Sequence, residues 1–228
     1  MITTMRRNWI DGWVSARGKL AFIMCALTIT SAAKAQAQAS EGRWRFAAST
    51  GAYVPFSSLI KAADSNDTRL GAGPAFSLEP QYLASGNVSV YLNAMLAAGS
   101  IRLGSSIQPD VVGPSDQVIL GSGTAGVMLS ADWFDHIQPT LRLGGGFKWY
   151  SFDLTDAENQ ARPTADVGLG FRGVSMGAIE VMAELRYLPS SFDQSKLPTR
   201  GIAAQDQRQN DLLFSIGIAV RPQVRRGT

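Results

Sequence analysis

The feature that most constrains this chain is a period-two alternation of apolar and other side chains, which recurs in eight stretches after residue 42. Because successive side chains of a β-strand point to opposite faces of a sheet, the pattern predicts strands and not helices. We place the strands at residues 43–55, 69–83, 88–102, 118–133, 137–152, 163–172, 176–188 and 210–221.

The connections between these strands alternate in length. The long, polar connections are residues 56–68, 103–117, 153–162 and 189–209. The short connections are residues 84–87, 134–136 and 173–175. Long connections at one end and short ones at the other are typical of bacterial outer-membrane barrels. We therefore predict an all-β fold, an eight-stranded antiparallel up-and-down transmembrane β-barrel, with both ends of the barrel sequence on the short-turn side.

The alternation also separates two faces. In the closing strand, Phe214, Ile216 and Ile218 share one face, with Ser215 and Gly217 opposite. A soluble lipocalin-like barrel would turn the apolar face inward, so the pattern alone leaves two orientations open. Glycine favours an inward polar face, because glycine weakens an exposed strand but gives a narrow lumen room. The glycines on the polar face are Gly71, Gly73, Gly126, Gly144, Gly146, Gly168, Gly170 and Gly217.

Aromatic residues support the same orientation, since membrane barrels carry aromatic girdles at both interfaces. Those near predicted strand ends are Trp44, Phe46, Tyr82, Trp133, Phe134, Trp149, Phe152 and Tyr187. In the second strand, the alternation puts Leu70 and Phe76 toward lipid and Arg69 toward the lumen.

The N-terminus reads as a cleavable signal peptide. Basic residues precede the apolar stretch 20–29, and small residues at A-x-A spacing follow it, which predicts cleavage between 35 and 39. We assign residues 1–37 to the signal and 38–228 to the barrel domain. The only cysteine, Cys25, lies in the apolar stretch. Without residues 1–37 the chain has sixteen basic and seventeen acidic residues, so no basic surface that binds nucleic acid is expected.

The closing stretch 210–221, NDLLFSIGIAVR, looks like the strand signal that the barrel-assembly machinery reads. With this stretch and the strand pattern, the chain resembles the eight-stranded outer-membrane barrels of the OmpA transmembrane-domain and OmpX-like type. It departs from them in one respect: residues 222–228 follow the strand, whereas such strands commonly end the chain on Phe or Trp. The resemblance implies export across the inner membrane, residence in the bacterial outer membrane, and contact with outer-membrane lipid and lipopolysaccharide.

Catalytic motifs are weak. The only histidine, His136, falls in a short connection that strand parity puts at the periplasmic end, where it is read as a turn residue. The loop carboxylates lack calcium-loop spacing, and Gly144-Gly145-Gly146 continues into a strand where a phosphate-binding loop needs a helix. No enzyme activity, metal site or cofactor is expected.

The predicted lumen does carry a group of charged side chains of both signs. They are Arg45, Glu79, Asp132, Arg142, Lys148, Asp166, Arg172, Glu180, Glu184, Arg186 and Arg221. Because an isolated buried ion costs several kcal/mol, these charges must pair or stay hydrated. They form either a salt-bridged plug that holds the barrel or a rearrangeable gate for small ions.

These features leave a ranked set of functions. The first is a non-enzymatic structural or surface-interaction barrel with a largely plugged lumen, and the second is a porin-like channel for ions or small solutes. A lipid-active enzyme and a soluble lipocalin-like carrier rank lower. The loops carry no motif that names a ligand.

Overall fold

The computed structural model describes residues 43–61, 66–105, 107, 117–131, 137–154, 156–176, 179–198 and 206–221. The predicted signal segment, Asp132 and His136 lie outside these residues. Within the described chain, no helix is long and apolar enough to cross a membrane.

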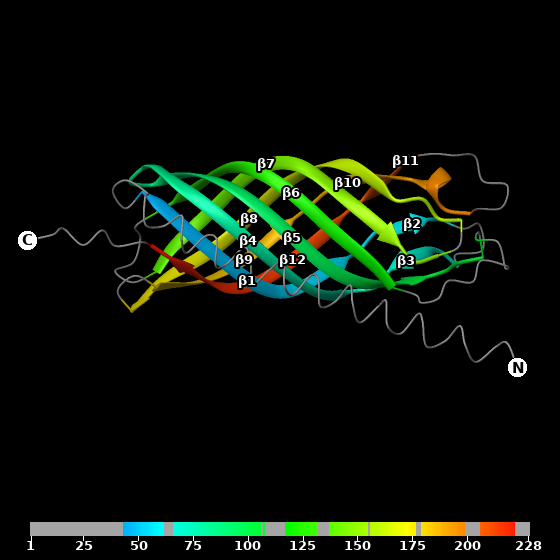
Figure 1. Cartoon of the computed structure of the whole chain (residues 1–228), viewed down its shortest axis with the longest axis horizontal. Coiled ribbons are helices and arrows are strands. Elements are labelled where there is room, and N and C mark those ends of the chain that lie inside the picture. The colour runs from blue at the N-terminus through cyan, green and yellow to red at the C-terminus, as the bar shows by residue number, and fades with distance from the viewer. Residues whose placement is uncertain are drawn as a thin grey trace, which may run out of the picture. The chain divides into compact units, whose positions relative to one another are not determined.

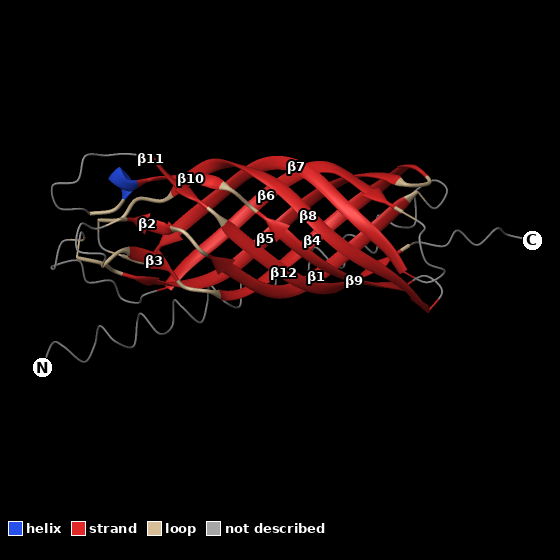
Figure 2. Cartoon of the chain, turned by 180° about the vertical axis from the view of Figure 1, so that it is seen from behind, coloured by secondary structure: helices blue, strands red, loops and turns tan. Residues whose placement is uncertain are grey.

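Eight long antiparallel strands form a closed barrel (Figures 1 and 2). They are β1 (Trp44–Pro55), β4 (Gly73–Ser85), β5 (Val88–Arg102), β6 (Gln117–Ser130), β7 (Ile137–Phe152), β8 (Gln160–Met176), β9 (Ile179–Tyr187) and β12 (Asp211–Val220). Neighbours in the chain pair with each other, and β12 closes the barrel by pairing with both β1 and β9. The predicted fold class is confirmed. Trp44 and Val220, where the barrel begins and ends, lie at the short-turn end.

Two of the long connections contain further short elements at the other, long-loop end. The elements are β2 (Ser58–Ile60), β3 (Thr68–Leu70), β10 (Ser190–Asp193), the 3₁₀-helix η3 (Gln194–Lys196) and β11 (Asp206–Gln209). Here β3 pairs with β2 and β5, while β10 pairs with β8 and β11. We call these five elements the rim. Runs of three or four residues are too short for an alternation to stand out, so the sequence did not predict them.

A capping contact starts η3. The hydroxyl and backbone N–H of Ser195 donate to the carboxylate of Asp193, at 2.6 and 3.0 Å. These hydrogen bonds favour the charged form and lower the pKa of Asp193 below its usual value.

The predicted strand 69–83 is wrong at its start. The strand is interrupted at residues 71–72, so β3 ends at Leu70 and β4 begins at Gly73. Leu70 pairs with Ile101 of β5, is buried and faces the interior, whereas Arg69 is exposed. This reverses the predicted faces, because the alternation starts again in a separate strand.

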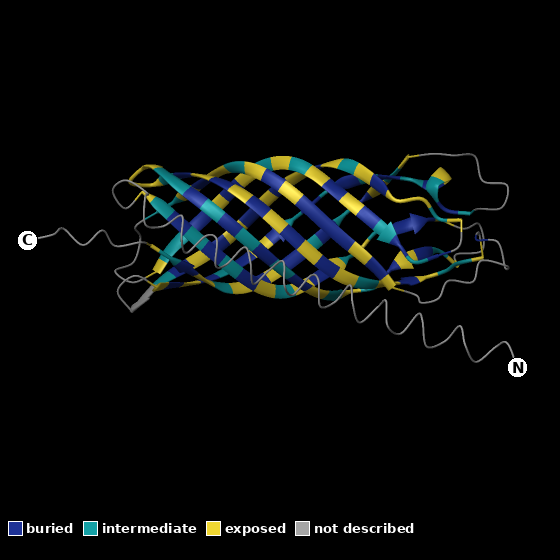
Figure 3. Cartoon of the chain, in the orientation of Figure 1, coloured by how far each residue is buried: buried dark blue, intermediate teal, exposed yellow. Residues whose placement is uncertain are grey.

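Elsewhere the apolar rows face outward, as the alternation predicts. Figure 3 shows exposed and buried residues alternating along the barrel strands. Large apolar side chains on the outside include Leu92, Leu143, Phe147, Leu169, Phe171, Val181, Leu185, Phe214, Ile216 and Ile218. The lipocalin-like orientation, with this face inward, is therefore excluded.

Aromatic residues mark both ends of the apolar band. At the short-turn end, Trp44 packs against Phe46 and Tyr82, with ring centroids 6.3 and 5.2 Å apart. At the long-loop end, Phe56 stacks on Tyr187 at 6.2 Å. The ten-residue step from Phe46 to Phe56 spans about 34 Å of strand, or about 24–28 Å along the axis at the usual barrel tilt. That height matches the lipid-facing band of a membrane barrel.

The interior has two layers. A polar and charged layer fills the membrane-level lumen, and an apolar layer, which we call the cap, fills the long-loop end beneath the rim. The cap consists of Tyr53, Leu59, Ile60, Leu70, Ala75, Met95, Ala97, Ile101, Ile107, Val118, Leu120, Tyr150, Phe152, Leu154, Leu188, Phe192, Leu197 and Leu213. The prediction of a polar lumen therefore holds only below the cap. The expectation that Phe152 belongs to an aromatic girdle is wrong, because its ring is buried in the cap.

Candidate functional site

The charged layer contains equal numbers of buried acids and bases among the described residues. The bases are Arg45, Arg142, Lys148, Arg172 and Arg186, and the acids are Glu79, Asp166, Glu180, Glu184 and Asp211. We call these ten side chains the charged network. Each is at most 7% exposed, and they come from six of the eight barrel strands. The alternation places them inward, so the network follows from strand register.

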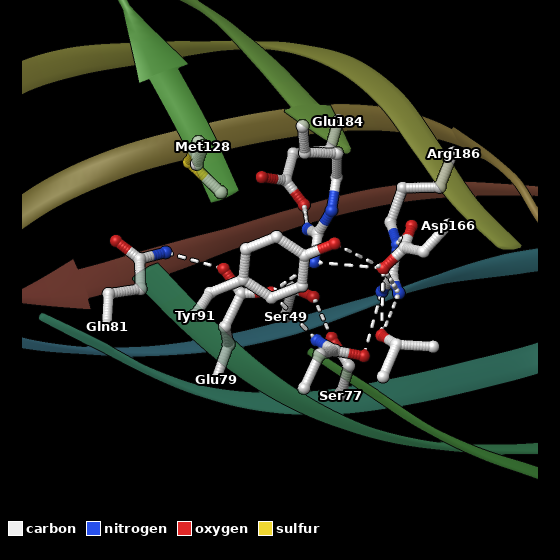
Figure 4. Close-up of polar contacts among 12 residues, drawn as sticks. Ser49, Ser77, Glu79, Gln81, Tyr91, Met128, Asp166, Glu184 and Arg186 are labelled. Atoms are coloured by element: carbon white, nitrogen blue, oxygen red, sulfur yellow. Dashed lines mark hydrogen bonds and ion pairs between the residues drawn. The ribbon is translucent and has the colours of Figure 1, made fainter. Parts of the chain in front are cut away.

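Arg142 of β7 lies at its centre. Figure 4 shows side chains of this part of the lumen, with Glu79, Tyr91, Asp166, Glu184 and Arg186 labelled. The Arg142 guanidinium contacts the carboxylates of Glu79, Glu184 and Asp166 at 2.6, 2.8 and 3.2 Å. It also lies over the ring of Tyr91, 4.2 Å from the centroid. One cation thus joins β4, β8 and β9 to β7.

Arg186 forms a second centre beside the first. Its guanidinium donates to both oxygens of Asp166, at 3.0 and 2.7 Å, and to the side-chain oxygen of Asn93 at 3.0 Å. Asn93 in turn donates to Glu79 at 2.9 Å, which links the two centres. Thr124 and Tyr91 donate to Asp166 at 2.8 and 3.1 Å.

Toward the short-turn end the network becomes more basic. Arg45 and the half-exposed Arg221 share Glu180, at 3.1 and 2.8 Å. Arg172 donates to the side-chain oxygen of Gln81 at 2.9 Å and contacts the sulfur of Met128. No described carboxylate forms an ion pair with Arg172.

Toward the cap, Lys148 forms an ion pair with Asp211. Both side chains are fully buried, and the Lys148 ammonium lies 5.1 and 5.0 Å from the ring centroids of Tyr53 and Tyr150. Gln209 donates to Asp211 at 2.8 Å. The pair thus lies where the charged network meets the apolar cap.

Glycines make space for the central side chains. A Cβ at Gly144 would lie 2.2 Å from the Tyr91 hydroxyl and 2.5 Å from the Ala125 carbonyl oxygen. A Cβ at Gly168 would lie 2.8 Å from two side-chain carbons of Arg142. The enrichment of glycine on the polar face therefore has a steric cause.

Ten of the eleven charged residues that the sequence predicts in the lumen face the interior or lie at its short-turn end. The eleventh, Asp132, lies outside the described residues. Sequence reasoning missed Asp211, although its spacing from Leu213 and Ser215 puts it on the same inward row. This two-residue spacing could have identified Asp211 from the sequence. The carboxylate stands at the first position of the strand, where alternation is hardest to read.

The network has the properties of a closed structure. Arg142, Arg186 and Lys148 are 2, 1 and 0% exposed, so solvent does not reach the middle of the lumen. Each acid has a basic partner, which offsets part of the desolvation cost. Among the described residues, no three His, Cys, Asp or Glu side chains could hold a metal ion. His136, whose catalytic role the sequence disfavours, lies outside those residues.

Comparison with known proteins gives matches in structure only. No family model matches the chain, and no characterised protein matches its sequence. The chain is similar in structure to Neisserial surface protein A, with 15% identity over 79% of this chain and 97% of that one and a TM-score of 0.54. It is also similar to the outer membrane protein OprG of Pseudomonas aeruginosa, with 13% identity over 81% and 98% and a TM-score of 0.52. At these identities the likeness concerns the fold, a small outer-membrane barrel.

Proposed function

We propose that the protein is a non-enzymatic barrel of the bacterial outer membrane, closed by its charged network and used for a structural or surface-interaction role. The observation that carries the proposal is a neutral, solvent-free network beneath an apolar cap, inside a wall that is apolar outside.

The membrane location is supported by the outer wall. Its apolar side chains, with aromatic residues at both ends, would make a large patch that water does not tolerate. The two structural relatives are a surface protein and an outer membrane protein by name. In such barrels the short turns face the periplasm, so the rim faces outward. Residues 1–37 then serve as the export signal, and residues 210–221 as the segment read by the assembly machinery.

The closed lumen argues for a plug. Ion pairs within it join strands that are not neighbours in the barrel, since Arg142 of β7 pairs with Glu79 of β4 and Glu184 of β9 as well as with Asp166 of the adjacent β8. Opening a path for ions would strip buried charges of their partners, at a cost of several kcal/mol for each. The cap would have to open as well, because its side chains fill the long-loop end.

A surface role fits the rim. Membrane barrels often have long outer loops, but here β2, β3, β10 and β11 extend the sheet beyond the aromatic level. Phe192 anchors this extension, since it is fully buried against Tyr150 and Phe152. A rim held in this way presents a fixed surface to the outside.

Two measurements on the full-length protein purified in detergent test the proposal. We expect a gel mobility shift on boiling, as for a folded membrane barrel, and no conductance steps in planar bilayers. The variant Glu180→Gln should be less stable than wild type and should show no conductance either, because it leaves Arg45 and Arg221 without their shared acid. Glu158→Gln changes an exposed ion pair and serves as the control.

Three outcomes would contradict the proposal. Steady conductance of the wild-type protein would make it a channel. A variant Glu180→Gln that is stable and conducts anions would make the network a gate. Recovery of a folded protein from solution without detergent or lipid would remove the membrane location.

A further inference from the structure

Two exposed arginines stand at the upper edge of the lipid-facing wall, on β3 and β5. The outward row of β5 runs through Val90, Leu92, Ala94, Leu96 and Ala98 before it reaches Ser100 and Arg102. Since alternate residues of one strand share a face, Arg102 continues the apolar row. It does so at the long-loop end, where the apolar band stops.

Arg69 of β3 lies directly opposite Arg102 in the antiparallel register. Both side chains are exposed, and directly opposite residues have Cβ atoms about 4.5–5.5 Å apart on the same face. Like charges in such a pair repel each other and destabilise the pairing. The arrangement therefore calls for an anion between or above the two guanidinium groups.

The chain supplies only part of that negative charge. Asp67 accepts from Arg69 at 3.0 Å and from the hydroxyl of Ser58 at 2.7 Å. Arg102 makes no ion pair within the described chain. One positive charge of the pair is left over, on the guanidinium that continues the lipid-facing row.

The surface next to Arg102 is hollowed. An open depression of about 390 Å³ is lined by Ser100, Ile101, Arg102 and Leu103. Below it, the outward row presents Ala98 and Leu96. A ligand in the hollow would thus meet a cation and hydroxyl at its head and an apolar wall beneath.

We propose that Arg69 and Arg102 bind the phosphate of a phosphorylated glycolipid of the outer leaflet, whose acyl chains lie along the outward row of β5. Guanidinium groups bind phosphate through paired, charge-assisted hydrogen bonds, which makes arginine well suited to this ligand. The proposal rests on the membrane location and orientation proposed above, because those put Arg102 at the level of the outer headgroups.

The test uses full-length protein in nanodiscs of phosphatidylcholine containing diphosphoryl lipid A, with the same lipid A without phosphates as the neutral probe. Native mass spectrometry counts the lipid A that stays bound on release from the disc. We expect wild-type protein to retain the phosphorylated form, and Arg102→Gln to bind it at least about tenfold more weakly. Arg208→Gln, which removes an exposed charge from β11, is the matched control and should bind like wild type.

The contrary outcomes are distinct. Equal retention by Arg102→Gln and wild type, or of lipid A with and without phosphates, would overturn the proposed site. Inorganic phosphate that displaces lipid A at equal concentration would show a site for a soluble anion and would overturn the lipid assignment. The gel shift on boiling, measured on the same samples, keeps these failures apart from a failure of the membrane location itself.

Discussion

Arg142 shows how a single side chain can hold a membrane barrel together. It is 2% exposed and touches three carboxylates from three other strands. A cation in that position is costly to bury, and the acids around it are costly to bury without it. The energetic effect of the network is therefore best measured by removing one partner.

Replacing Arg142 with Met should lower the free energy of unfolding by about 3–5 kcal/mol, because Glu79 and Glu184 lose their buried cation. Urea unfolding in lipid vesicles measures the loss. The control is Arg208→Met, at an exposed site on the rim. A loss below about 1 kcal/mol, the usual range for exposed pairs, would mean that water already solvates the acids.

Gly144 offers a test of the packing around Tyr91. Gly144→Ala should destabilise the barrel by about 1–3 kcal/mol, since the new Cβ would overlap the Tyr91 hydroxyl and the Ala125 carbonyl. Gly123→Ala is the matched control, because a Cβ there meets nothing within 4 Å. Equal unfolding midpoints for the two variants would show that the lumen has more room than the contacts indicate.

For single residues, the sequence predicts only which face of a strand each side chain lies on. Alternation identified which charges point inward, but it says nothing about depth along the strand or about partners across the lumen. It therefore could not separate the central group around Arg142 from the Lys148–Asp211 pair beneath the cap. Partner choice depends on strand tilt and register, which bring Arg45 next to Glu180 across 135 residues of sequence.

At the scale of elements, long strands were predictable and short ones were not. Strands such as β5 and β7 repeat the alternation over 15 and 16 residues, so their bounds agree with those predicted to within a residue. The rim strands are too short for the alternation to be recognised in the sequence. They form because their inward residues, Leu59, Leu70 and Phe192, pack against the other side chains of the cap, which is a tertiary effect.

Phe192 should stabilise the folded rim but should not be needed for the folded barrel. Phe192→Ala removes a ring packed edge-on against Tyr150 and Phe152, and a cavity of that kind costs about 3–5 kcal/mol. We expect a protease added to proteoliposomes to cut this variant within 188–210 while the boiling shift persists. Phe171→Ala, on the exposed wall, should resist cleavage as wild type does. Loss of the boiling shift in Phe192→Ala would mean that rim and barrel unfold together.

The outward face of β12 gives a test of lipid contact. Ile216 is 54% exposed in the middle of the strand, so Ile216→Arg should cost about 2–4 kcal/mol of folding free energy in a bilayer. Ile216→Val is the control for side-chain shape. Ser215→Arg should also be harmful, because Ser215 faces a filled lumen opposite Glu184. Tolerance of Arg at position 216 would show that this face does not meet lipid.

For the whole molecule, the distance between the aromatic belts sets the bilayer that fits best. The span from Phe46 to Phe56 corresponds to about 24–28 Å along the axis. Folding yield across phosphatidylcholine vesicles of increasing chain length should peak where the hydrocarbon thickness is in that range, because mismatch costs free energy on either side. A yield that rises steadily toward the thickest bilayer would place the belts elsewhere.

The sequence separations within the charged network have a consequence for the order of assembly. Arg45 bonds to Glu180, Arg172 to Gln81 and Arg142 to Glu79, across 135, 91 and 63 residues. The first pair needs β12 in place between β1 and β9, which closes the barrel, and the other two need the strands from β4 to β7 or β8 in register. Such non-local contacts form slowly. The network is therefore assembled late. Contacts that form after the rate-limiting step slow unfolding and leave the folding rate almost unchanged, so the lumen acts as a kinetic lock on a finished barrel.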